Sequence, residues 1–220
     1  MCAVCPSGTY ERSRFVNTII TIGRQFGSGG HEIGRLLAER LGIPCYDKEL
    51  ITLAAREAGI SEEVLARVDE TATSSLLYAA TAGAYMGGVF HGVQTLPIND
   101  RAFLALTDII RSKAEEGPCV FVGRCADFIL RDREPVLNVF VRADLPFRIA
   151  RIAEGENCSE RDAESLIAKA DKKRAKYYNF YTQKRWGSSE CYDLILNRAK
   201  TDRETAISLI ISYAQSMATD

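Results

Sequence analysis

No apolar run in the 220-residue sequence reaches the roughly 18 residues that a membrane-spanning helix needs. The first 15 residues, MCAVCPSGTYERSRF, lack the apolar centre of a secretory signal peptide. Neither sign of charge dominates, because 28 Lys and Arg residues face 29 Asp and Glu residues. These absences argue against a membrane protein, a secreted protein and a surface that binds polyanions over its whole area. A local basic site stays open, since net charge says nothing about distribution.

Cysteine is present, but not in a pattern typical of disulfides or metal sites. The seven residues are odd in number and scattered along the chain, and several lie inside predicted strands. In a chain of this size, that pattern indicates reduced thiols and a cytoplasmic protein. Cys2 and Cys5 form a CxxC, but no second pair and no nearby histidine completes a zinc site. We therefore expect no metal held by protein ligands.

Short buried runs alternate with longer helical stretches, which is typical of an α/β fold with a mainly parallel sheet. At 46% hydrophobic residues, the chain can bury one sizeable core. Polar or Gly- and Ala-rich excursions at 71–98 and 154–191 interrupt the alternation. We predict strands at 17–22, 44–46, 118–122, 136–142 and 192–197, and helices that include 31–42, 61–70, 101–117 and 202–218.

A glycine-rich loop connects the first predicted strand to the first predicted helix. Backbone N–H groups and the positive end of a helix can hold a phosphate in this position. The full P-loop pattern GxxxxGK[ST] is not met, because the lysine and the hydroxyl residue after it are replaced. A tight turn without a ligand explains the loop, taken alone, equally well. The candidate phosphate-binding residues are Gly27, Ser28, Gly29, Gly30 and His31.

Two charged residues that flank this loop favour opposite interpretations. Arg24 stands where the first glycine of the pattern belongs, and its side chain can reach back over the loop as a phosphate donor. Glu32 places a carboxylate in the first helical turn, which disfavours an anion there. A solvated turn arginine is the alternative for Arg24.

The stretch 18–50, with IGRQFGSGG followed by GIPCYDKEL, resembles the opening of the cytidylate kinase-like family, relatives of bacterial cytidylate kinase among the P-loop nucleoside monophosphate kinases. The resemblance continues in VFVGRCADFIL (120–130), in LPFRIARI (145–152) and in DKKR (171–174). These segments resemble the family's Gly-Arg segment, the arginine-bearing helix before the lid, and the Asp-x-x-Arg of the lid's return helix. The resemblance spans roughly residues 17 to 200.

The resemblance implies a P-loop NTPase-like, three-layer α/β/α fold with a five-stranded parallel sheet. It implies a nucleoside monophosphate (NMP)-binding excursion at about 47–99 and a lid at about 152–175. Residues 1–15 would form an N-terminal extension to a single kinase-like domain over 16–220. The implied reaction transfers the γ-phosphoryl group of ATP to a nucleoside monophosphate, with Mg²⁺.

The sequence also departs from the family pattern. Where cytidylate kinases have GSGKGT, this chain has Gly30, His31 and Glu32 in the last three positions, so the lysine and the Mg²⁺-binding threonine are absent. The family's Gly-Arg-Asp becomes GRC at 123–125, with an acid only at Asp127. The arginine that would grip cytidylate after Tyr46 is not evident.

Phosphoryl transfer needs positive charge on the transferring group, so the missing lysine calls for another cation. We predict Arg24, Arg151 and Arg174 in this role. For the acceptor we predict a set of polar residues near the carboxyl ends of the strands, where ligands gather in parallel sheets. The set comprises Tyr46, Asp47, Arg124, Asp127 and Arg148. Surface charge pairs, or an ion pair between Arg124 and Asp127, are the alternatives.

The leading hypothesis is an ATP-dependent phosphotransferase that acts on a nucleoside monophosphate or another small acceptor. The alternative is a catalytically impaired nucleotide-binding sensor or interaction protein. The run KYYNFYTQKRW (176–186) mixes aromatic and basic residues, which can stack single-stranded bases, but such a run more often packs a helix end. We therefore expect no nucleic acid and no membrane partner, and a homo-oligomer stays open.

Overall fold

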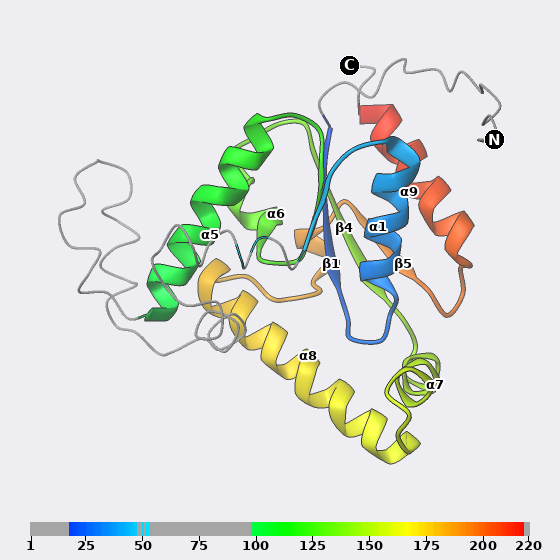
Figure 1. The fold of residues 1–220 in the computed structure, drawn as a ribbon. Coiled ribbons are helices and arrows are strands. Elements are labelled where there is room, and N and C mark those ends of the chain that lie inside the picture. The colour runs from blue at the N-terminus through cyan, green and yellow to red at the C-terminus, as the bar shows by residue number, and fades with distance from the viewer. Residues whose placement is uncertain (1–17, 48–49, 51, 53–97, 218–220) are drawn as a thin grey trace, which may run out of the picture.

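The computed structural model describes residues 18–47, 50, 52 and 98–217 (Figure 1). The predicted N-terminal extension lies outside these residues, as does nearly all of the predicted NMP-binding excursion with its helix at 61–70. The CxxC at Cys2 and Cys5 also lies outside them. Every residue predicted for the site is described.

Five parallel strands form one sheet in the order β2-β3-β1-β4-β5. In register, Ile20 of β1 pairs with Val120 of β3 on one side and with Leu137 of β4 on the other. The central strands are rich in Val and Ile because both faces of the sheet are covered. The predicted five-stranded parallel sheet is confirmed, with bounds β1 Ile19–Arg24, β2 Cys45–Tyr46, β3 Val120–Val122, β4 Val136–Arg142 and β5 Leu194–Asn197.

Helices cover both faces of the sheet and make three layers (Figure 1). On one face, α1 (Gly30–Leu41) and α9 (Arg203–Met217) pack on Ile20 and Ile22 of β1. On the other face, α5 (Ile98–Glu115) and α6 (Ala126–Ile129) pack on Ile19 and Phe121. Alternate residues of β1 therefore serve two separate cores, as the period-2 geometry of a strand requires.

The α7–α8 hairpin lies at the carboxyl edge of the sheet, where β1 ends (Figure 1). It consists of α7 (Leu145–Gly155) and the long α8 (Glu160–Thr182). The Ser159 side chain caps α8 by accepting the Asp162 N–H at 3.2 Å. Residues 152–175, predicted as a lid, thus comprise the end of α7, a short turn and the first two-thirds of α8.

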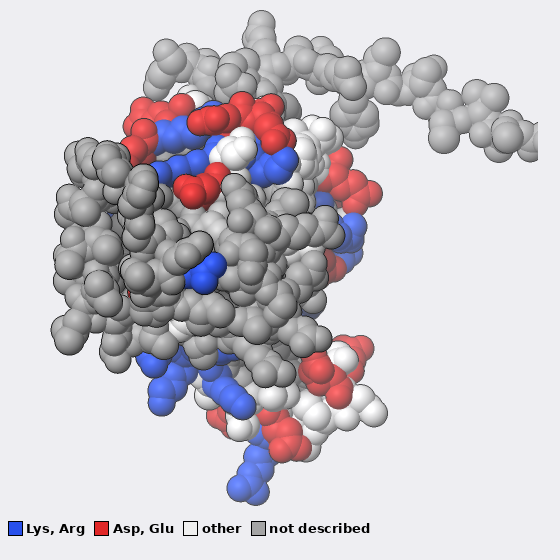
Figure 2. Space-filling model, turned by 60° about the vertical axis from the view of Figure 1, so that its left-hand side comes forward, with Lys and Arg blue, Asp and Glu red and all other residues white. Residues whose placement is uncertain are grey.

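The aromatic run at the end of α8 belongs to the core rather than to the surface. Tyr177, Tyr178 and Tyr181 are all buried, and the Tyr181 ring stacks on Phe103 with 4.0 Å between ring centroids. These rings are therefore not available to stack bases, and the packing alternative for this run is correct. Figure 2 shows acidic and basic side chains interspersed on the described part of the face it presents. Within the described part of the chain, no helix is both long and apolar enough to cross a membrane.

Candidate functional site

The glycine loop makes the tight strand-to-helix connection that its sequence predicts. Gly27 and Gly29 adopt left-handed backbone angles, with φ of 77° and 83°, which favour glycine. The buried Ser28 hydroxyl donates to the Gln25 carbonyl at 2.8 Å and fixes the shape of the turn. Gly29 is the N-cap of α1 and supplies no side-chain cap. The N-cap residue therefore makes no side-chain hydrogen bond to the first-turn N–H groups of α1.

A cavity of about 390 Å³ opens over this loop at the carboxyl edge of the sheet. Four arginines from four different elements line it, with Asp47 among them. Arg24 ends β1, Arg124 follows β3, and α7 and α8 supply Arg151 and Arg174. Four guanidinium groups thus converge on one glycine loop, and guanidinium groups are the side chains best suited to bind phosphate. We call this cavity the loop pocket.

Arg24 is directed toward β3 and not back over the loop. Its guanidinium lies directly against Gly123, and its Nη2 is 3.4 Å from Asp47 Oδ1. Its Cβ fills the space beside Gly30, where an added Cβ would lie only 2.5 Å away. Position 30 therefore has no room for the lysine of a standard P-loop while Arg24 is present.

Arg151 is the arginine that lies across the loop. Its Cζ is 3.7 Å from the position that a Cβ on Gly29 would take, and its Nη2 donates to Glu32 Oε2 at 3.3 Å. Arg203 of α9 donates to the other oxygen of Glu32. Burial raises the pKa of Glu32, but the hydrogen bonds and charges of Arg203 and Arg151 outweigh it, so the pKa lies below its ordinary value. Glu32 is thus an ionised carboxylate that lies beside the loop and already pairs with Arg151 and Arg203.

Arg174 and Arg124 complete the cluster. Arg174 Nη1 donates to the Arg24 carbonyl at 3.2 Å, and its guanidinium lies 5.5 Å from the centroid of the Phe26 ring. The chain after β3 runs through three successive left-handed residues, Gly123 (φ 78°), Arg124 (φ 60°) and Cys125 (φ 55°). Each of the two non-glycine residues costs about 1 kcal/mol or more in such a conformation, and strain of this kind gathers at functional sites. The turn brings Arg124 into the pocket.

Arg148, predicted to bind the acceptor, is instead a buried structural partner of the loop. Its Nη1 lies 2.5 Å from Asp171 Oδ2 and 3.3 Å from the Phe26 carbonyl oxygen. The other oxygen of Asp171 accepts the Phe26 N–H at 2.8 Å. Gly27 packs on α7, because an added Cβ would lie 3.1 Å from both Arg148 and Ile152. Arg148 and Asp171 therefore fasten the α7–α8 hairpin to the glycine loop.

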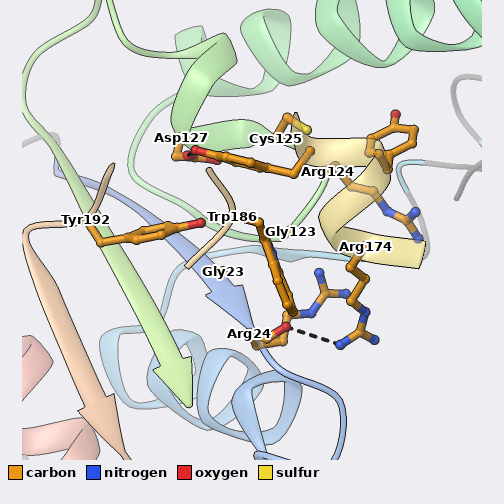
Figure 3. A pocket seen from close by; sticks show the side chains of 11 residues that line it. Gly23, Arg24, Gly123, Arg124, Cys125, Asp127, Arg174, Trp186 and Tyr192 are labelled. Atoms are coloured by element: carbon orange, nitrogen blue, oxygen red, sulfur yellow. Dashed lines mark hydrogen bonds between the residues drawn. The ribbon is translucent and has the colours of Figure 1, made fainter. Parts of the chain in front are cut away.

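A second, smaller cavity of about 50 Å³ adjoins the arginines on the α8 side of the sheet (Figure 3). Asp127 and Tyr192 lie at one side of it and Arg124 and Arg174 at the other. The Tyr178 hydroxyl donates to Asp127 at 2.6 Å. Burial raises the pKa of Asp127, and the hydrogen bond from Tyr178 opposes that shift. Asp127 is thus close to the cluster but engaged with a buried tyrosine.

The loop pocket gathers nine of the thirteen residues predicted for the site, and four lie apart from it. The Ser28 hydroxyl bonds within the loop, and Arg148 bonds to Asp171 of α8. Asp127 lines the smaller cavity instead. The Tyr46 ring stacks on Phe121 with 5.4 Å between centroids. The nine are Arg24, Gly27, Gly29, Gly30, His31, Asp47, Arg124, Arg151 and Arg174.

Sequence reasoning gave Asp171 no role, although DKKR contains it. Its contact with Phe26 joins positions 145 residues apart, which no local pattern indicates. The described residues include no cluster of three or more His, Cys, Asp or Glu residues that could hold a metal ion. The five described cysteines, Cys45, Cys119, Cys125, Cys158 and Cys191, form no disulfide with one another.

Known proteins resemble this chain in sequence and in structure. The model of the cytidylate kinase-like family matches residues 19–200. A cytidylate kinase from Methanothrix thermoacetophila is 26% identical over 200 residues, which cover 90% of this chain and 99% of that protein. The crystal structure of an uncharacterized protein from Eubacterium ventriosum is 31% identical, covers 90% of this chain and 99% of that one, and has a TM-score of 0.68.

A gluconokinase structure from Sinorhizobium meliloti shares the fold alone. It is 14% identical, covers 93% of each chain and has a TM-score of 0.50. Together with the five-stranded parallel sheet and the glycine loop at the start of α1, these likenesses confirm the predicted P-loop NTPase-like α/β/α fold.

Proposed function

Because the chain belongs to the cytidylate kinase-like family, we propose that it is an ATP-dependent phosphotransferase that passes the γ-phosphoryl group to a small acceptor. Nucleoside monophosphates are the first acceptors to test, since curated relatives are named cytidylate kinases. Arg24, Arg151 and Arg174 are the proposed catalytic cations, and Asp47 and Arg124 are proposed to contact the acceptor.

The observation that carries the proposal is the convergence of four arginines on the glycine loop. Phosphoryl transfer requires little covalent chemistry from the protein, so catalysis rests on positioning and on positive charge at the transferring group. A P-loop lysine supplies one such charge. Here the lysine is absent, and arginines from β1, α7 and α8 are positioned to supply the charge instead.

The residues present fit the phosphates of ATP. Left-handed glycines, an N-terminus of α1 without a side-chain cap, and the guanidinium of Arg151 over Gly29 form an anion cradle. ATP would supply the transferable phosphoryl group there. Mg²⁺ commonly keeps several waters and is shared with substrate phosphates, so it would enter with the nucleotide and needs no all-protein cage. We assign it no ligand in this chain.

The test is to incubate the full chain with ATP, Mg²⁺ and a panel of acceptors and to follow the formation of ADP. The panel includes CMP, UMP, AMP, D-gluconate, D-glycerate and glycerol 3-phosphate. Arg124→Ala and Arg174→Ala are expected to lower kcat/KM by about 100-fold, the scale of one lost charge-stabilising donor. Arg35→Ala is the control, because Arg35 is exposed and pairs with Glu39 of the same helix.

Binding of ATP without ADP formation on any acceptor would contradict the proposal. That result would favour the alternative, a nucleotide-binding protein without turnover. The replacement of the P-loop lysine and threonine by Gly30 and Glu32 is the observation that favours this alternative.

A further inference from the structure

His31 and Asp47 form a close pair inside the loop pocket. His31 Nδ1 lies 2.6 Å from Asp47 Oδ2. His31 is in the first turn of α1 and Asp47 follows β2, so two separate elements hold the pair. Both residues line the same cavity as the glycine loop and the four arginines. The imidazole therefore stands next to the place where phosphates are expected.

The two members of the pair differ in exposure. The Asp47 side chain is 10% exposed, and its second oxygen faces Arg24 at 3.4 Å. The His31 side chain is 61% exposed. Among the residues that the structure describes, none makes a hydrogen bond to His31 Nε2. A mostly buried carboxylate thus lies against one ring nitrogen of a largely exposed imidazole.

The Asp47 carboxylate beside Nδ1 favours the tautomer that carries its proton on that nitrogen. A carboxylate that accepts from Nδ1–H fixes the neutral tautomer whose lone pair is on Nε2. Nε2 can then take a proton from a group bound in the pocket. A histidine oriented by a carboxylate beside a reacting centre is an arrangement typical of general bases.

We propose that His31 is the general base of the phosphoryl transfer, that Asp47 positions it, and that the acceptor is a small hydroxyl compound carrying an anionic group. This inference rests on the proposed function and narrows its acceptor class. It assigns to His31 a chemical role in the transfer step.

A general base at this position would speed transfer to a hydroxyl acceptor but is not needed for transfer to a phosphate monoester. A phosphate monoester has its second pKa near 6, so at pH 7 the nucleophilic oxygen of a nucleoside monophosphate is mostly deprotonated already. A hydroxyl group keeps its proton at pH 7, and removing that proton in the transition state is worth about 10²- to 10⁴-fold in rate. The arginines beside Asp47 would hold the anionic group of such an acceptor.

The acceptor oxygen forms a bond to the γ-phosphorus of ATP, and the bond from that phosphorus to the β–γ bridging oxygen breaks. The electron pair leaves with ADP. The acceptor's hydroxyl proton goes to His31 Nε2, and Asp47 stabilises the resulting imidazolium through Nδ1–H.

Charged groups from every neighbouring element line the same pocket as this imidazole. Glu32 adjoins it on α1 itself. The others are Arg24 at the end of β1, Asp47 after β2, Arg124 after β3, Arg151 on α7 and Arg174 on α8. Variants at His31 are therefore compared with one another over the same pH range.

The test uses the full chain and two kinds of acceptor. Water is the simplest hydroxyl nucleophile, so ATP hydrolysis without an added acceptor needs no identified substrate. D-Gluconate, D-glycerate and glycerol 3-phosphate probe anionic hydroxyl compounds, and CMP, UMP and AMP probe phosphate nucleophiles. The variants are His31→Gln, His31→Ala and Asp47→Asn, with the exposed Arg35→Gln on the same helix as control. Thermal unfolding checks that each variant folds.

We expect His31→Gln to lower kcat for hydrolysis and for transfer to a hydroxyl probe by about 100-fold or more. The fall of kcat toward low pH should vanish in this variant, with KM for ATP unchanged. Added imidazole should restore part of the activity of His31→Ala, which a merely structural role would not allow. Asp47→Asn should shift the pH profile, because the imidazole loses its carboxylate partner.

Wild-type kcat and pH dependence in His31→Gln would overturn the inference. So would transfer by the wild-type protein to CMP, UMP or AMP but to no hydroxyl probe, a result that would leave the proposed function intact. If ATP is consumed with neither water nor any acceptor, the proposed function and the inference fall together.

Discussion

The Cβ of Arg24 occupies the space into which a side chain at position 30 would extend, since a Cβ added to Gly30 would lie 2.5 Å from it. The two positions are therefore coupled. A P-loop with glycine first and lysine after the last glycine becomes, in this chain, a loop with arginine first and glycine after. In the proposed function Arg24 is the cation of this loop, and position 30 has no room for a lysine while Arg24 is present.

Gly30→Ala is expected to disturb the loop, because its methyl group meets Arg24. Overpacking of this kind costs about 1–3 kcal/mol in the free energy of unfolding, and ATP affinity should fall with it. Urea denaturation and nucleotide titration measure the two effects. In the Arg24→Gly background the same change should be nearly neutral, because the clash is removed. Equal losses in both backgrounds would show that the two positions are independent.

Gly123→Ala is expected to displace Arg24, whose guanidinium lies where the new methyl group would go. Gly42→Ala is a matched control, because Gly42 also has a left-handed φ of 66° but nothing within 4 Å of an added Cβ. Both variants should lose about 1–2 kcal/mol through backbone strain. Only Gly123→Ala should also lose turnover, by about 100-fold. Matching steady-state rates for the two variants would contradict the role of Arg24.

Asp171→Asn is expected to loosen the glycine loop through Arg148, which would keep its buried charge without a carboxylate partner. The loss in unfolding free energy should be about 2 kcal/mol or more, between an exposed pair and the 3–5 kcal/mol of a fully buried one. KM for ATP should rise. Glu39→Gln breaks an exposed pair with Arg35 and should change stability by about 0.5 kcal/mol or less. An Asp171→Asn variant as stable as Glu39→Gln would rule out the fastening role.

Asp127 is expected to make stability depend on pH in one direction. Burial raises its pKa above 3.8, so the folded protein binds the carboxyl proton more tightly than the unfolded chain does. The contribution of Asp127 to the free energy of unfolding therefore falls as pH rises from about 3.8 through the folded pKa. Asp127→Asn keeps an acceptor for Tyr178 and removes the titration. Its free energy of unfolding relative to wild type should rise as pH increases above about 3.8. A relative fall in urea midpoints over the same pH increase would show the opposite sign.

Local sequence patterns were sufficient for the sheet and for the loop. Runs rich in Val and Ile, such as VLNVFVR at 136–142, identify strands buried on both faces, and glycines after such a run identify a turn into a helix. The carboxyl ends of parallel strands share one edge, so the convergence of Arg24 and Arg124 near Asp47 followed from strand assignment alone.

The direction of individual side chains could not be predicted from the same patterns. Arg148 and Arg151 are three residues apart and share a helix face, yet Arg148 is buried against Asp171 while Arg151 lies exposed over Gly29. What separates them is the position of α8, which is a tertiary feature. Likewise, Arg24 lies toward β3 because Gly123 leaves room for its guanidinium, and that glycine is distant in sequence.

The most direct test of the account follows the γ-phosphate of ATP, labelled with ³²P, in a single turnover with the acceptor panel. We expect the label to leave ATP in the wild-type protein, about 100-fold more slowly in Arg24→Ala, and faster again in Arg24→Gly/Gly30→Lys, which restores the loop cation at its usual position. Label that stays on ATP in the wild-type protein, or transfer in Arg24→Ala at the wild-type rate, would contradict it.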